Sequence, residues 1–140
     1  MSIEQATYFW VEAGDMSGGS RNQMEFTDEM ALFFDEKSRA SEQVFIAFDK
    51  ETKAYCTFSN RGQDYDQWVN KWRLSLITKA KGGVDYAGRV VGFEKRKIGQ
   101  AFVYVITVAI VGSDTHEKWR SSSVYVGATA GAEGRAYGYF

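Results

Sequence analysis

The stretch GRVVGFEKRKIGQAFVYVITVAIV, residues 88–111, indicates two β-strands joined by a charged turn. β-Branched and aromatic residues favour strands from Gly88 to Glu94 and from Ala101 to Val111, with 95–99 at the tip of the hairpin. In the second strand both alternating faces are apolar. That pattern predicts a strand covered on both sides, near the middle of a sheet.

Outward from this hairpin, the chain shows more strand patterns than helix patterns. Segments rich in β-branched and aromatic residues, or alternating in polarity, predict further strands at 6–12, 43–48, 53–59 and 118–126. The segment 14–22 is dense in turn-forming residues and is expected to be a loop.

One continuous helix is expected at about 28–40. Thr27 can cap its first turn, and the acids Asp28 and Glu29 suit the positive end of the helix dipole. The segment 64–81 fits both periodicities, and we assign it a short helix at 64–70 followed by a strand at about 71–79.

These elements predict an α+β fold. We expect an antiparallel sheet of about six or seven strands with one or two helices, either closed into a small barrel or covered by helices on one face. Residues 1–140 show no internal repeat and no linker, so they are interpreted as a single domain. The Gly-rich C-terminal tail, 127–140, is expected to fray unless it docks.

Residue counts argue against several kinds of chemistry. Cys56 is the only cysteine, so no internal disulfide forms, and His116 is the only histidine, which leaves too few ligands for a typical zinc site. The chain lacks a Gly-x-Ser-x-Gly elbow. We therefore expect a non-enzymatic protein without cofactor or metal. The absence of a signal-peptide pattern and of a membrane-length apolar run predicts a soluble, cytoplasmic protein that binds no membrane.

Two weaker patterns remain open. The acids Asp64, Asp66, Asp85 and Glu94 could hold Mg²⁺ as in a nuclease, but Lys95 follows Glu94 directly and so falls on the opposite face of the strand. Ser17 to Arg21 could form a phosphate-binding nest, although it lacks the residues of a P-loop.

Aromatic content and charge distribution suggest two functions. Aromatic residues make up 16% of the chain. Residues 1–70 hold 6 Lys/Arg against 13 Asp/Glu, and residues 71–140 hold 11 against 5. Such asymmetry favours either a basic face for a polyanion or head-to-tail self-association, unless the two halves interleave in one sheet.

The first hypothesis is a small binding protein for single-stranded nucleic acid. Cations neutralise phosphates and aromatic rings stack on bases. The cations expected to contribute are Lys95, Arg96 and Lys97 at the hairpin tip, with Lys79, Lys81, Arg89, Lys118 and Arg120 from neighbouring segments. The interleaved rings are Trp72, Tyr86, Phe93, Trp119 and Tyr125.

The alternative is a structural or assembly subunit, of a virion or a filament, that forms homo-oligomers. Its oppositely charged halves and its aromatic tail would supply complementary contacts, which generate rings or fibres. An enzyme or small-ligand binder whose site the pattern does not reveal, and an inhibitor that binds another protein, also stay open.

Overall fold

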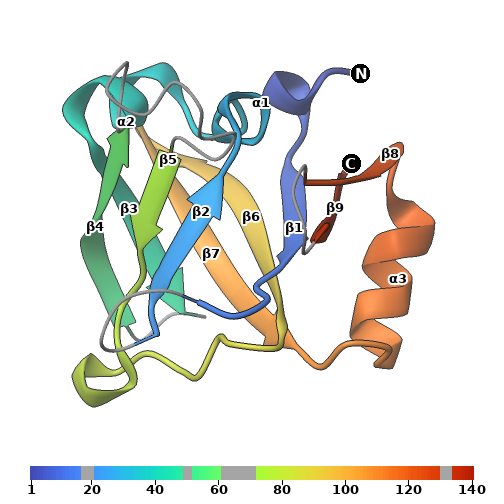
Figure 1. The fold of residues 1–140 in the computed structure, drawn as a ribbon. Helices are drawn as coiled ribbons and strands as arrows, with labels where there is room; N and C mark the ends of the chain where they lie inside the picture. The colour runs from blue at the N-terminus through green and yellow to red at the C-terminus, as the bar shows by residue number, and fades with distance from the viewer. Residues whose placement is uncertain (17–20, 49–51, 61–71, 130–133) are drawn as a thin grey trace.

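The computed structural model describes residues 1–16, 21–48, 52–60, 72–129 and 134–140. Its main feature is a mixed sheet of nine strands that curls into a half-barrel (Figure 1). The strand order is β2-β5-β4-β3-β7-β6-β1-β9-β8. The strands are β1 (Tyr8–Glu12), β2 (Gln23–Phe26), β3 (Gln43–Phe48), β4 (Thr52–Asn60), β5 (Trp72–Ser75), β6 (Val90–Ile98), β7 (Ala101–Ala109), β8 (Tyr125–Ala128) and β9 (Ala136–Tyr139).

Helices are minor. The described residues include α1 (Asp28–Ala31), α2 (Glu36–Ser41) and α3 (Asp114–Ser122), together with the short 3₁₀ segments η1 (Ile3–Gln5) and η3 (Lys79–Lys81). The expectation of a β-rich, barrel-like fold is therefore confirmed in part: the sheet curls into a half-barrel, and the described residues include three α-helices where one or two were expected. The sheet has more strands than expected, and it is not purely antiparallel because β3 and β7 run parallel.

The central hairpin has a shorter turn than predicted, and its strands cover Val90–Ile98 and Ala101–Ala109 in place of 88–94 and 101–111. β6 continues through Lys95, Arg96 and Lys97 to Ile98, and the turn consists of Gly99 and Gln100. Gly99 has φ +63°, a conformation that favours glycine at the first position of a two-residue hairpin turn. The placement of the three cations in the turn was therefore wrong, because they lie in the strand and alternate between its two faces.

Two further assignments are corrected. The helix expected at 28–40 is interrupted after α1 ends at Ala31, and a second helix follows Asp35, whose extended backbone and carboxylate cap α2. The interruption leaves both Phe33 and Phe34 fully buried. The strand expected at 118–126 is instead α3 followed by β8. Ser113 caps α3, and its buried residues His116 and Trp119 are spaced three apart, as one face of a helix requires.

Other segments also differ from expectation. β2 begins just after the predicted loop 14–22, and β5 is shorter than the predicted strand 71–79. The tail 127–140 is built into the sheet through β8 and β9. The helix predicted at 64–70, the acids Asp64 and Asp66, and most of the nest at 17–21 lie outside the described residues.

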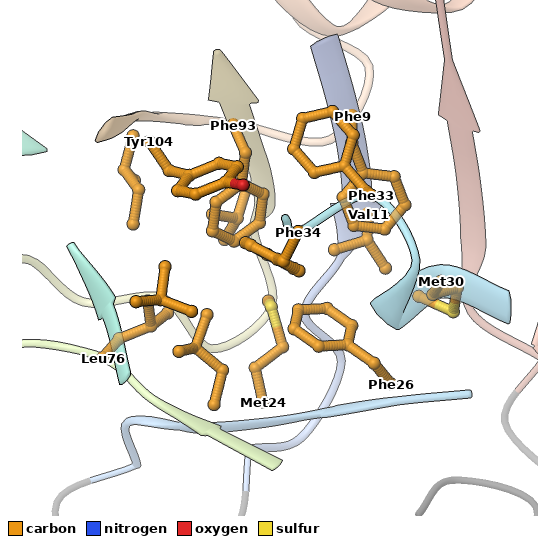
Figure 2. Packing of buried hydrophobic residues seen from close by; sticks show 14 of the residues in the cluster. Phe9, Val11, Met24, Phe26, Met30, Phe33, Phe34, Leu76, Phe93 and Tyr104 are labelled. Carbon is orange, nitrogen blue, oxygen red and sulfur yellow. The ribbon is translucent and has the colours of Figure 1, made fainter. Parts of the chain in front are cut away.

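The inner face of the half-barrel holds an aromatic core (Figure 2). Phe34 lies at its centre, with ring centroids 4.9 Å from Phe58 and 4.8 Å from Tyr104. Tyr104 also carries a polar link, because its hydroxyl donates to the Asp35 carboxylate at 2.7 Å and accepts the Asp35 N–H at 2.7 Å. The core thereby fixes the start of α2 against β7.

Asp35 makes the stability of this corner depend on pH. Burial acts to raise the pKa of its carboxyl, but hydrogen bonds from Ser38 and Tyr104 outweigh burial and hold it below the ordinary 3.8. Because this pKa is lower in the folded than in the unfolded state, the ionised carboxyl stabilises the folded protein at pH values above the unfolded pKa. That stabilisation is lost as the pH falls through the folded pKa. We expect D35N, measured by urea unfolding between pH 6 and pH 2, to lose less stability on acidification than wild type. Equal slopes for the two proteins would contradict this.

A second, smaller core lies on the outer face and attaches α3 to the sheet. Trp10 and Trp119 pack there with Val90 and Ala109. Two glycines make room for the indoles, because a Cβ at Gly138 would lie 2.7 Å from the Trp10 ring and one at Gly92 would lie 2.8 Å from Trp119. The indole N–H of Trp10 also donates to the Ser123 hydroxyl at 2.8 Å. This contact fixes the point at which the chain leaves α3 and enters β8.

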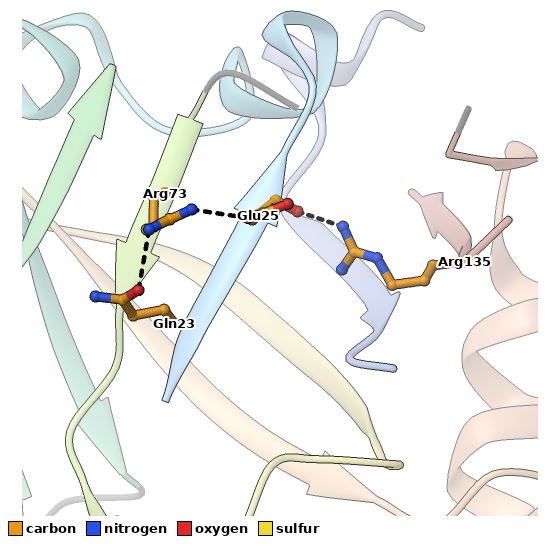
Figure 3. Close-up of polar contacts among 4 residues, drawn as sticks. All are labelled: Gln23, Glu25, Arg73 and Arg135. Carbon is orange, nitrogen blue, oxygen red and sulfur yellow. Dashed lines mark hydrogen bonds and ion pairs between the residues drawn. The ribbon is translucent and has the colours of Figure 1, made fainter. Parts of the chain in front are cut away.

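The two edge strands of the sheet, β2 and β8, have different surroundings. At the β2 end, the sheet curls until β2 faces β1 (Figure 1). Arg135 contacts both strands, and its hydrogen bond to Glu25 of β2 is drawn in Figure 3. Its guanidinium donates to the Glu12 carbonyl oxygen of β1 at 3.2 Å and to the Glu25 carbonyl oxygen of β2. Arg73 holds β2 from the other side through an ion pair of 2.9 Å with the Glu25 carboxylate. The β2 edge therefore faces the protein's own chain.

Candidate interaction surface

Most of the rings predicted to stack on bases are in the interior. Trp72, Tyr86, Phe93 and Trp119 are all buried. Trp72 packs on Phe58 with centroids 4.6 Å apart, and the Tyr86 hydroxyl donates to the Ile77 carbonyl at 2.6 Å. Their faces are used by the protein's own packing, so among the predicted rings only Tyr125 is exposed.

The cations of the hairpin are also engaged. The Lys95 ammonium donates to the Phe33 carbonyl at 2.7 Å and lies 5.2 Å from the Phe33 ring centre. Its pKa is lowered because the side chain is partly removed from water, although the charge of nearby Asp35 opposes this effect. Arg96 pairs with Glu94 at 2.9 Å on the strand surface, and this hydrogen bond raises the pKa of Arg96.

The remaining predicted cations are exposed but spread over the molecule. Lys79 and Lys81 lie on η3, Arg89 precedes β6, and Lys118 and Arg120 lie on α3. In Figure 1, η3 is the yellow-green coil at the lower left and α3 is the orange helix at the right. Lys97 lies near the hairpin end, 5.7 Å from the Phe102 ring centre. The structure therefore does not gather the predicted cations and rings into one groove.

Strand β8 is the edge strand at the opposite end of the sheet from β2, and its backbone groups set it apart. Its register with β9 pairs Tyr125 with Tyr139 and Gly127 with Tyr137, and the Thr129 N–H donates to the Arg135 carbonyl at 2.8 Å. Backbone groups of alternate residues point to opposite sides of a strand. The N–H and C=O groups of Val126 and Ala128 consequently point away from β9, along the open edge.

The side chains at this edge are apolar and exposed. Val124 is 59% exposed, Tyr125 43% and Val126 42%. Tyr125 stacks on Tyr139 with centroids 5.4 Å apart, while Val126 projects to the face on which Trp10 packs against Gly138. Both faces of the β8 edge thus present apolar surface to solvent.

Charge is absent from the same segment. No Asp, Glu, Lys or Arg occurs from Ser121 to Thr129, and the whole chain has no proline. Natural proteins usually protect an open sheet edge with charges, prolines, bulges or a covering segment. The β2 edge is covered in this way by Arg135, whereas β8 has neither charge nor proline. We refer to Val124, Tyr125, Val126, Gly127 and Ala128 as the β8 edge.

The outer face of β3 and β4 carries another exposed ring, Tyr55, which packs on Phe45 with centroids 4.7 Å apart. It lies in the interior of the sheet, where the strand backbones are already paired. The β8 edge differs because it combines apolar side chains with outward backbone groups that pair with no other strand in the described part of the chain.

Sequence reasoning identified one residue of this edge, Tyr125, and gave it a different role. It missed Val124 and Val126 because the expected strand 118–126 placed them in a continuous run with Lys118 and Arg120. The signal that could have found them is the uncharged segment 121–129, which is long for a surface in a chain with 25% charged residues.

Comparison of the chain with protein-family models, with curated proteins and with solved structures found no match. Within the described ranges, no group of three or more His, Cys, Asp or Glu side chains is placed to hold a metal ion. No helix among the residues that the structure describes is long and apolar enough to cross a membrane.

Proposed function

We propose that this chain is an assembly protein that acts by adding a β-strand of a second copy to its β8 edge. The observation that carries the proposal is an edge strand without charge and with apolar side chains on both faces, whose outward backbone groups have no strand partner among the described residues. In β-strand addition, main-chain hydrogen bonds provide affinity and neighbouring side chains provide specificity. A segment without charges also lets two copies approach without placing like charges opposite each other.

Binding of single-stranded nucleic acid has less structural support. Four of the five rings assigned to it are buried, and Lys95 and Arg96 already have partners within the chain. The mixing of the two oppositely charged sequence halves within one sheet also weakens the case for a basic face. For the same reason, the proposed assembly rests on the β8 edge and not on oppositely charged ends.

The proposal predicts that a single charge at the edge abolishes self-association. V126K places an ammonium where two strands would meet, and its desolvation opposes pairing. V84K is the matched control, because Val84 has nearly the same exposure, 40%, and lies away from β8. We expect light scattering to show that wild type and V84K are assembled. The V126K protein should have the mass of one 15.8-kDa chain.

Salt and an oligonucleotide complete the experiment. Association through apolar surface should persist at 500 mM salt, whereas phosphate binding weakens steeply above about 50 mM. A wild-type protein that stays monomeric at every concentration would refute the proposal. Binding of oligo-dT at 50 mM salt that disappears at 500 mM, together with no self-association, would favour the nucleic-acid hypothesis instead.

A further inference from the structure

We infer that the assembly closes at two copies, with β8 paired antiparallel to β8 of the second copy about a two-fold axis at Gly127. This inference rests on the proposed function and goes beyond it, because it specifies the number of copies and the strand register. The argument combines the asymmetry of the two sheet edges with the positions of the outward backbone groups.

The difference between the β2 and β8 edges limits the assembly to two copies. An open-ended filament would need a heterologous contact, in which β8 of one copy adds to β2 of the next. The outward side of β2 faces β1 of its own chain, and the Glu25 carbonyl there already accepts a hydrogen bond from Arg135. Among the strands that the structure describes, β2 is thus not available to β8, and β8 of a second copy is. Such a contact uses both open edges and leaves the protected β2 edges at the two ends of the joined sheet.

The outward backbone groups select the register. Val126 and Ala128 are the residues of β8 that point away from β9, and the Val124 N–H is already bonded to the Tyr139 carbonyl. An axis at Gly127 places Val126 opposite Ala128 of the second copy, so both residues of each copy can bond to both residues of the other. An axis at Val126 would place Ala128 opposite Val124, whose N–H is occupied.

Side-chain size agrees with this register. Val126 lies opposite Ala128, a larger residue against a smaller one, and Gly127 lies opposite its own copy. The pair at Gly127 is of the non-hydrogen-bonded type, in which Cα atoms are only about 4.5 Å apart. A residue without a side chain suits that close approach.

Cysteine cross-linking tests the register. Two Cα atoms about 4.5 Å apart allow a disulfide, so G127C should form a covalent dimer in mild oxidant. The new Cβ would lie 2.6 Å from the Tyr125 hydroxyl, which is the end of an exposed side chain and can move. V126C is the matched control, because two copies of residue 126 would be diagonal neighbours about 7–8 Å apart, too far for a disulfide. Wild type controls for the buried Cys56.

We expect G127C to run mainly as a covalent dimer on non-reducing gels, with V126C and wild type as single chains. The mass of wild type should reach twice 15.8 kDa and stay there as concentration rises. A mass that continues to rise, or cross-linking of V126C in place of G127C, would overturn the closed dimer. If V126K still abolished association in that case, the proposed function would stand. A monomeric wild type would instead overturn both.

Discussion

Replacing Trp10 with alanine is expected to lower the free energy of unfolding by about 3–5 kcal/mol, the usual cost of removing a buried large aromatic side chain. Trp10 is fully buried, packs against His116 of α3 with centroids 5.3 Å apart, and donates to Ser123. Its loss would leave a cavity between α3 and the sheet, and the Ser123 hydroxyl would keep only its hydrogen bond to the Trp119 carbonyl, at 2.7 Å. Chemical denaturation monitored by circular dichroism measures the effect.

The W10A substitution should also disrupt the β8 edge. Trp10 lies on β1 against Gly138 of β9, and β9 is the strand that holds β8. We therefore expect amide hydrogen exchange to increase first in α3, β8 and β9, and self-association to weaken at protein concentrations where wild type is assembled. W10F separates the contributions, since it keeps an aromatic ring and loses the indole N–H. A W10A protein with wild-type stability would show that the second core does not support the edge.

Strands with local signals were predictable from the sequence. β3 is rich in β-branched and aromatic residues, β4 alternates in polarity, and the apolar run of β7 indicates a strand covered on both faces. These patterns depend on residues two apart, which the sequence shows directly. β2 was missed because its four residues include the polar Gln23 and Glu25, and its strand conformation depends on pairing with β5, a segment about fifty residues away.

The α1–α2 break and α3 show where local patterns mislead. Phe33 and Phe34 are both buried in the turn between the end of α1 at Ala31 and the cap of α2 at Asp35, and the Tyr104 hydroxyl that supports this geometry comes from β7. In α3, the aromatic Trp119 and the following serines and valines look like a strand. Two features favour a helix instead: Ser113 caps its first turn, and Gly92, which has no side chain, leaves room for Trp119.

The candidate site was harder to predict than the fold. The sequence shows how many rings the chain has, but not which face of the sheet each one occupies. Trp72, Tyr86 and Phe93 are on the inner face, whereas Tyr125 is exposed because its strand is the last in the sheet. Position at an edge is a property of the complete strand order, and strand order depends on long-range pairing such as the parallel contact of β3 with β7.

Replacing Arg135, which covers the β2 edge, should increase the number of copies in the assembly. In R135M, the carbonyls of Glu12 and Glu25 lose their charged donor, and we expect a loss of about 1–3 kcal/mol in the free energy of unfolding. The larger effect concerns assembly, because the outward side of β2 becomes available to β8 of another copy. That contact is heterologous and does not close, so R135M should form species that grow with concentration beyond the dimer, as light scattering would show.

Two further variants make this result specific. R89M removes an exposed cation from the same half of the chain and should remain a dimer, which controls for the change in net charge. The double variant R135M/V126K should be monomeric, because growth through β2 still requires an unaltered β8. An R135M protein that stays a dimer would mean that Arg135 does not protect the β2 edge. Growth of the double variant would mean that R135M aggregates by a route independent of β8, and the explanation of closure by edge protection would then fail.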